Sequence, residues 1–187
     1  PEITLNKIIE APKSIDVFLG SAAIPGKEFI LAESGREFVL DDEFSSSNKR
    51  INISQFDYLR QDDSKNIIFA KDASMQAFGV SSDAILNLSL MNSPYYEIVM
   101  RMNKIDQLPL YFTVGCGSNC QGSVQLPALK LDTWNTLMIP ISCMEKNGLD
   151  ASKVQIRALF QSRGDINYDL HSIVIKEGGF KGSKVSC

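Results

Sequence analysis

The chain has 187 residues, of which 44% are hydrophobic and 22% charged, as in a globular domain large enough to bury a sizeable core. Its formal net charge is -3 and its lysines and arginines are scattered, which argues against binding to nucleic acid or to anionic lipid. No apolar run reaches the roughly 20 residues that a membrane-spanning helix needs.

Short segments with strand character follow one another along the chain, separated by clusters of Gly, Ser, Asn and Asp. We expect strands at residues 16–20, 28–32, 51–58, 66–70, 74–79, 84–90, 96–102 and 110–114. Pro94 stands at a strand start, and Pro140, late in a strand, indicates an edge or a bulge. Helical turns are expected only at 143–148 and 150–153. This pattern predicts an all-β fold, a two-sheet antiparallel sandwich of the jelly-roll type.

A strand, a C-x3-C turn and a second strand follow one another in residues 111–126. Cysteines four positions apart in an extended strand are too distant to pair, so Cys116 and Cys120 can form a disulfide only if the chain reverses between them. The Gly-Ser-Asn segment between them permits that reversal. We therefore expect a disulfide-closed hairpin, worth about 2 kcal/mol, whose main effect is to fix the shape of one loop.

The remaining cysteines carry less information. Cys143 follows an apolar run and is expected to be a buried thiol, whereas Cys187 is expected to be disordered and able to crosslink dimers. Free thiols in the hairpin are an alternative to the disulfide. A metal site made by Cys116, Cys120, Cys143 and His171 is a weaker one, because C-x3-C is not the usual spacing of structural zinc ligands.

The order of four segments resembles the C-terminal β-sandwich domain of bacterial exo-β-glucanases and β-glucosidases of glycoside hydrolase family 3. The segments are FDYLRQDDS (56–64), VGCGSNCQGSVQL (114–126), LDTWNTLMIPISC (131–143) and NYDLHSIVIKE (167–177). The resemblance is strong over residues 109–176 and moderate near 57–69. It departs from the family at Asp63 and Ser64, where a smaller apolar residue is expected after the acids, and it does not cover the run after Gly178.

The resemblance implies a galactose-binding-like sandwich at 15–178, with a linker from an upstream catalytic part at 1–14 and a flexible tail at 179–187. Since the chain starts at Pro1 without an initiator methionine or signal sequence, we expect a mature product or an excised fragment. The resemblance also implies a non-catalytic accessory domain of a β-glucan hydrolase, which packs on the catalytic domains of the same polypeptide and borders the substrate cleft. An autonomous carbohydrate-binding module and a protein-interaction or adhesion sandwich are the alternatives.

The chain alone is not expected to be an enzyme, and no catalytic residue is assigned. Its single histidine, His171, has no nucleophile motif near it. The barrel of the family it resembles takes about 250 residues and so lies outside this chain. No cofactor is expected, although Asp41, Asp42 and Glu43 could contribute to a structural calcium site. A hairpin disulfide indicates an oxidising compartment, the periplasm or the exterior of a bacterium.

Aromatic side chains could stack on the C–H face of a sugar, and the expected ligand is β-glucan or a gluco-oligosaccharide. Trp134 is the first candidate, although a packing role is expected more than an exposed one. Tyr95 and Tyr96 should point to opposite faces of a strand, so that one is buried and the other exposed.

Polar and loop residues complete the set of candidates for contact with sugar or with the catalytic cleft. Arg60, Gln61 and Asp62 put donors and acceptors at a strand end, where an ordinary polar turn is the alternative. Ile24 and Pro25 lie in the loop at 20–26, which is placed to pack on the catalytic part or to be an ordinary connection.

Overall fold

The computed structural model describes residues 14–20, 24–33, 36–40, 50–178 and 183–187. The strands are β1 (Ser14–Leu19), β2 (Glu28–Glu33), β3 (Arg36–Leu40), β4 (Ile51–Phe56), β5 (Ser64–Phe69), β6 (Gln76–Leu86), β7 (Pro94–Ile105), β8 (Tyr111–Gly115), β9 (Gln121–Gln125), β10 (Trp134–Pro140), β11 (Val154–Ser162), β12 (Ile166–Glu177) and β13 (Ser183–Lys184). Helix α1 spans Ile141–Lys146, and the 3-10 helices η1 and η2 span Leu88–Leu90 and Ala151–Lys153.

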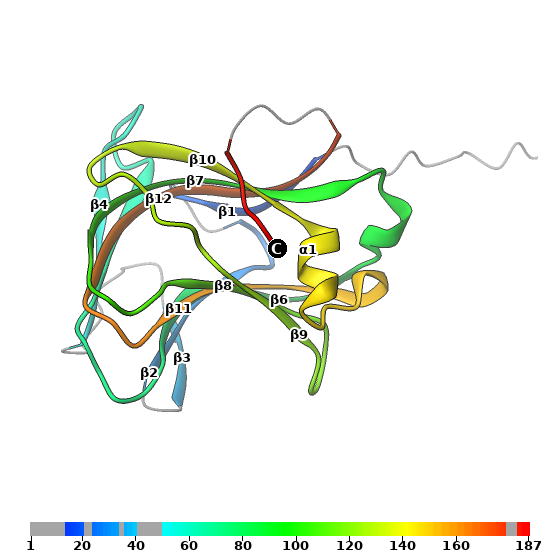
Figure 1. The fold of residues 1–187 in the computed structure, drawn as a ribbon, viewed down its shortest axis with the longest axis horizontal. Coiled ribbons are helices and arrows are strands. Elements are labelled where there is room, and N and C mark those ends of the chain that lie inside the picture. The colour runs from blue at the N-terminus through cyan, green and yellow to red at the C-terminus, as the bar shows by residue number, and fades with distance from the viewer. Residues whose placement is uncertain (1–13, 21–23, 34–35, 41–49, 179–182) are drawn as a thin grey trace, which may run out of the picture.

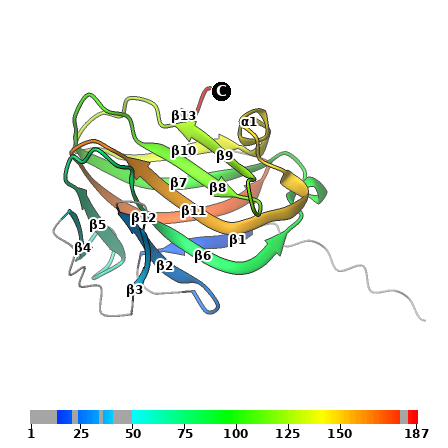
Figure 2. The same cartoon turned by 90° about the horizontal axis from the view of Figure 1, so that it is seen from below.

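The strands form two sheets that face each other as the layers of a sandwich (Figure 1). A seven-stranded sheet has the order β13-β10-β7-β12-β5-β4, with β1 also paired to β12, and a six-stranded sheet has the order β3-β2-β6-β11-β8-β9 (Figure 2). Every pair is antiparallel except β10 with β13. The predicted two-sheet antiparallel sandwich is confirmed.

Period-two alternation fills the space between the sheets with apolar side chains. Strand β7 turns Ile98, Met100 and Met102 inward, and all three are almost fully buried. From the other sheet, Phe112 of β8 and Phe160 of β11 pack in the same core. The ring centroids of these two phenylalanines are 5.3 Å apart. The residues at alternate positions of the same strands therefore face outward. They do not fill the core between the sheets, so their side chains are available for binding.

Two local expectations were wrong. Tyr95 and Tyr96 are both buried, because the outward-facing Tyr95 lies in a central strand with Pro140 and Lys176 at the neighbouring positions. The strand expected through residues 84–90 stops at Leu86, and a 3-10 helix follows. There Asn87 Oδ1 accepts a hydrogen bond from the backbone N–H of Ser89, which favours the turn over continued pairing.

Strands β8 and β9 form the predicted hairpin, and a disulfide joins Cys116 to Cys120 across its turn. The N–H of Cys116 donates to the carbonyl oxygen of Cys120 at 2.9 Å, and Gly117 and Asn119 have positive φ values of 112° and 55°. The turn formers therefore make the reversal that the spacing required.

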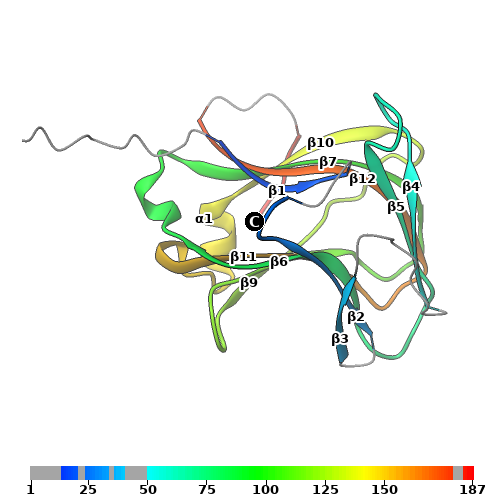
Figure 3. The same ribbon diagram turned by 180° about the vertical axis from the view of Figure 1, so that it is seen from behind.

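The C-terminus corrects the expectations for the other two cysteines. Residues 183–187 were expected in a flexible tail, but β13 pairs with the edge of β10, and the side chain of Val185 is buried in the core. This return places the C-terminus beside α1 (Figure 3). The Cα atoms of Cys187 and of Cys143 on α1 are 5.3 Å apart, and a disulfide joins the two residues. Cys143 is thus neither a free thiol nor a metal ligand, and Cys187 is not available to crosslink dimers.

The two disulfides should differ in their contribution to stability. The pair Cys143–Cys187 closes a loop with a sequence separation of 44, for which loop-closure entropy gives about 4 kcal/mol, against about 2 kcal/mol for the separation of 4 at Cys116–Cys120. Replacing Cys143 and Cys187 together by Ala should therefore lower the free energy of unfolding more than replacing Cys116 and Cys120. Urea denaturation without reductant measures both, and an equal or reversed order would contradict the expectation.

Candidate functional site

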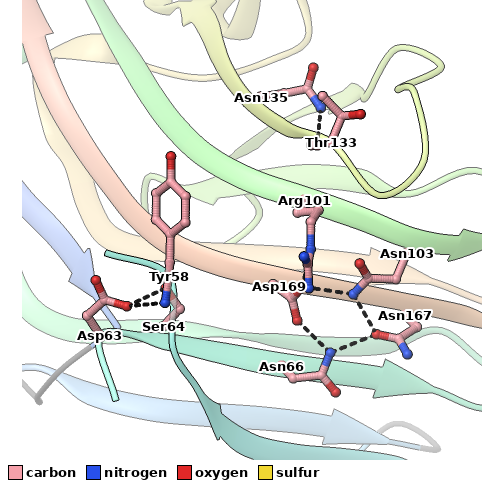
Figure 4. A network of polar contacts seen from close by, with 10 residues as sticks. All are labelled: Tyr58, Asp63, Ser64, Asn66, Arg101, Asn103, Thr133, Asn135, Asn167 and Asp169. Atoms are coloured by element: carbon pink, nitrogen blue, oxygen red, sulfur yellow. Dashed lines mark hydrogen bonds and ion pairs between the residues drawn. The ribbon is translucent and has the colours of Figure 1, made fainter. Parts of the chain in front are cut away.

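Five polar side chains gather on the outward face of the seven-stranded sheet. They are Asn66 from β5, Arg101 and Asn103 from β7, and Asn167 and Asp169 from β12 (Figure 4). Arg101, Asn167 and Asp169 each lie between two core residues of their strand, and Asn66 and Asn103 each lie next to one, Ile67 and Met102. Strand alternation therefore places the five side chains on the same side of the sheet. Pairing of β12 with both β5 and β7 brings the three strands side by side.

The carboxylate of Asp169 is the centre of this group. Its Oδ2 accepts from Arg101 Nε and lies 2.7 Å from Arg101 Nη2, and it also accepts from Asn103 Nδ2 at 2.9 Å. Its Oδ1 accepts from Asn66 Nδ2 at 2.7 Å. The Asp169 side chain is fully buried although it points away from the core, so these donors replace the water it has lost.

Asn167 closes the network. Its Oδ1 accepts from Asn66 Nδ2 at 2.8 Å and from Asn103 Nδ2 at 3.2 Å. These bonds fix the orientation of all three amides, so that Asn167 Nδ2 remains as a donor and the oxygens of Asn66 and Asn103 as acceptors. Within the described part of the chain these three atoms make no hydrogen bond. The result is a set of oriented donors and acceptors on a half-buried surface.

Aromatic rings border the network on one side. Tyr58 stacks on Trp134 with ring centroids 3.8 Å apart, and the Arg101 guanidinium lies 4.7 Å from the ring centre of Phe56 and 5.6 Å from that of Trp134. Trp134 is half-buried between Tyr58 and Arg101 and therefore packs at the rim rather than lying open as a broad platform. The expectation that packing would dominate for Trp134 agrees with these contacts.

The loop that carries Tyr58 is held by a buried acid. Both oxygens of the Asp63 carboxylate accept backbone N–H groups, from Tyr58, Leu59 and Arg60, at 2.8 to 2.9 Å. Burial alone would raise the pKa of Asp63, but these three donors outweigh it and hold the pKa below its usual value. Asp63 thus has a structural role, because it shapes the loop at 57–63.

The other candidates from the sequence have different places. Arg60, Gln61 and Asp62 are exposed on the loop at 57–63, beside the aromatic rings. Pro25 is exposed and Ile24 half-buried, on the turn before β2. The buried Tyr95 cannot contact sugar. Asp41, Asp42 and Glu43 lie outside the described residues, and among those described no three His, Cys, Asp or Glu side chains converge as metal ligands.

The single histidine has a serine and an acid beside it, which the sequence did not reveal. His171 Nδ1 lies 3.1 Å from Ser64 Oγ, 3.0 Å from the carbonyl oxygen of Asp63 and 3.8 Å from Asp63 Oδ2. A catalytic triad needs the serine and the acid on opposite ring nitrogens, and here both face Nδ1. Ser64 is also fully buried, so the group is structural.

A buried cation lies under the same corner of the sheet. Lys65 Nζ donates to the carbonyl oxygen of Gly20 at 2.6 Å and to Gln55 Oε1. Burial disfavours its charged form and lowers the pKa of Lys65 to about 8. The side chain thereby ties the end of β1 to β5.

Sequence reasoning did not find the network at Asp169. The only local signal was the occurrence of polar residues at alternate positions, Asn167-Asp169-His171 and Arg101-Asn103, inside otherwise apolar strands. Their partners are 64 to 103 positions away along the chain.

A family model described as Galactose-binding domain-like, Exop_C, matches residues 27–175, about four fifths of the chain. The chain belongs to this family. The comparison with curated proteins found no match. In the part of the chain that the structure covers, no helix combines the length and the apolar character needed to cross a bilayer.

Solved structures share the fold. The exo-1,3/1,4-beta-glucanase ExoP from a Pseudoalteromonas species aligns with a TM-score of 0.73 at 14% identity over 100% of this chain, which spans only 23% of that protein. The separately solved extra C-terminal domain of ExoP aligns with a TM-score of 0.71 at 15% identity, over 92% of this chain and 98% of that domain.

A carbohydrate-binding module shares the same architecture. The family 11 module from Clostridium thermocellum, solved in complex with a beta-1,3-1,4-mixed-linked tetrasaccharide, aligns with a TM-score of 0.52 at 9% identity over 89% of this chain and 95% of the module. At these identities the three structures establish the fold of the chain and not its ligand.

Removing the buried carboxylate should be costly. Asp169→Ala leaves Arg101 without its counterion, and we expect the free energy of unfolding to fall by about 3 kcal/mol or more. The matched control is Asp165→Ala just before the same strand, whose pair with Lys104 is exposed and should contribute at most about 1 kcal/mol. Urea denaturation at neutral pH compares the two, and equal losses would show that the Asp169 network is not a stabilising centre.

The lysine under the loop should make stability depend on pH. Unfolded Lys65 has the ordinary pKa of 10.5 and folded Lys65 one of about 8, so between these values the unfolded state binds more protons and alkali favours folding. Relative to Lys65→Met, the free energy of unfolding of the native sequence should rise by about 3 kcal/mol from about pH 7.5 to about pH 10.5. A difference that stays constant over this range would be inconsistent with the lowered pKa.

Proposed function

We propose that this chain is a non-catalytic accessory domain of a β-glucan-degrading glycoside hydrolase, and that the outward face of its seven-stranded sheet binds β-glucan. The shared fold with the extra C-terminal domain of an exo-1,3/1,4-beta-glucanase supports the first part. The shared fold with a module that was solved with a β-1,3-1,4-linked tetrasaccharide supports the second.

One observation supports the outward face of the seven-stranded sheet as the binding face. Three oriented amides and an arginine surround a buried carboxylate, and aromatic rings lie beside them. Sugar hydroxyls need donors and acceptors in fixed positions, and the C–H faces of sugar rings need apolar surface. Because the network is already formed without ligand, little side-chain freedom would be lost on binding.

The finer part of the proposal concerns the parent protein. We assign the catalytic residues to an upstream part of the same polypeptide, of glycoside hydrolase family 3, against which the domain packs at the turn with Ile24 and Pro25. The exposure of Pro25 is compatible with such a contact. The two disulfides favour a location outside the cytoplasm, in the periplasm or beyond the cell.

The stacked pair of Tyr58 and Trp134 supports an autonomous carbohydrate-binding module as the second candidate. A single half-buried aromatic pair supplies few contacts to sugar. The free domain should therefore bind soluble glucan weakly, with a dissociation constant of about 1 mM. An affinity of this size suits a domain that acts next to a catalytic cleft, where linkage raises the effective concentration of the glucan.

The amides of the network should decide the affinity. In an NMR titration with a β-1,3-1,4-linked tetrasaccharide, replacing Asn103 and Asn167 together by Ala should weaken binding about tenfold, because two or more hydrogen bonds are lost. The matched control replaces Gln121 and Gln125 by Ala, two exposed amides on β9 of the other sheet, and should bind as the native chain does. Melting curves of both variants serve to check that they fold. Equal affinity of all three proteins would refute the proposed face.

A further inference from the structure

The seven-stranded sheet has a junction at His171. On one side of β12, strand β5 pairs with residues up to Leu170, and β1 takes over the same side from Ser172 onward. At the changeover the N–H of Gly20 donates to the carbonyl oxygen of His171 at 2.9 Å. Two separate strands thus share one edge of β12, and the loop at 57–63 stands over the place where they meet (Figure 1).

A hollow of about 340 Å³ lies at this junction. Its lining consists of Leu19, Gly20, Leu59, Arg60, Gln61, Asp63 and His171. We call it the junction hollow. It adjoins the network described above, because Asn167, Asp169 and His171 follow one another along the outward face of β12, about 7 Å apart.

The walls of the junction hollow are held rigidly. Asp63 binds three backbone N–H groups of its loop, and Asp57 Oδ1 accepts from the N–H of Asp62 at 2.7 Å. Gly20 packs so closely that a Cβ there would lie 2.3 Å from the carbonyl oxygen of Asp63, and Lys65 binds its carbonyl oxygen from below. A hollow with fixed walls is suited to a ligand of defined shape.

The chemistry of the lining fits a neutral polyhydroxylated ligand. A carbonyl oxygen can only accept, so His171 Nδ1 donates to that of Asp63, and in this tautomer Nε2 is an acceptor for a hydroxyl. The side chains of Arg60 and Gln61 are exposed at the rim and make no hydrogen bond to the described residues. Leu19 and Leu59 add apolar surface beside these polar groups.

The polar row along β12 ends at this hollow. The register of β12 against β7 shifts between Leu170 and Ser172, so His171 lies at this irregularity. Half-buried Ser172 follows it, and the next outward side chain after Ser172, Val174, is apolar and nearly buried. A chain that lies over Asn167 and Asp169 and runs toward His171 therefore meets the junction hollow and the loop at 57–63 at its end.

We propose that the junction hollow binds the terminal glucosyl unit of a glucan chain whose following units lie over the Asp169 network. This inference rests on the proposed function, and it means that the domain recognises the ends of glucan chains. Arg60 and Gln61 would contact the hydroxyls of the terminal unit, and His171 would accept one of them.

The sequence offers its own reporter, since His171 is the only histidine. Its imidazole C–H signals in an NMR spectrum should shift on addition of a β-1,3-1,4-linked tetrasaccharide, together with the side-chain amide signal of Asn167 and with the same dissociation constant. Polymeric β-glucan at the same glucosyl concentration has few ends, so it should shift the Asn167 signal and leave the His171 signals in place.

A variant pair tests the rim. Replacing Arg60 and Gln61 by Ala should remove the His171 shift and weaken tetrasaccharide binding about tenfold. Replacing Arg163 and Gln107, an exposed arginine and glutamine elsewhere, should change neither. Both pairs are exposed, so each variant is expected to fold as the native chain does.

The outcomes separate the two proposals. A tetrasaccharide that shifts the Asn167 signal but not the His171 signals overturns the junction hollow and leaves the proposed face standing. No shift of either signal overturns both. Equal His171 shifts with polymer and tetrasaccharide overturn the assignment to a chain end, because interior units then occupy the hollow.

Discussion

The outward face of the seven-stranded sheet is organised by one buried carboxylate, that of Asp169. Removing a charge from water is tolerated only where donors replace the water, and here donors come from Arg101 and Asn103 on β7 and from Asn66 on β5. The same bonds fix the direction of each amide. A stability requirement at one atom thereby creates an oriented polar surface over three strands (Figure 4).

The aromatic border depends on that centre. Arg101 is held by Asp169 and lies against the rings of Phe56 and Trp134, and Trp134 in turn supports Tyr58 on its loop. Asp63 holds the same loop from the other end through three backbone N–H groups. Two buried acids therefore fix the polar and the apolar parts of the face, which is the arrangement that sugar recognition requires.

Much of the fold could be predicted from the sequence, because alternation at period two is a local signal and the C-x3-C spacing admits one geometry for a disulfide. The partners of Asp169 could not, since they lie 68 positions away at Arg101 and 103 at Asn66, and only strand order brings them together. The disulfide between Cys143 and Cys187 was missed for the same reason, because it depends on the return of β13 to β10. Alternation also misled the prediction for Tyr95. It points outward as expected, but it lies in a central strand whose neighbours bury it.

A crystal structure of the chain with a β-1,3-1,4-linked tetrasaccharide tests the central claim most directly. The account predicts that the sugar lies over the seven-stranded sheet, with hydroxyls bonded to Asn167 Nδ2 and to the oxygens of Asn66 and Asn103. Sugar bound instead to the outward face of the six-stranded sheet, beside Gln121 and Gln125, would contradict it.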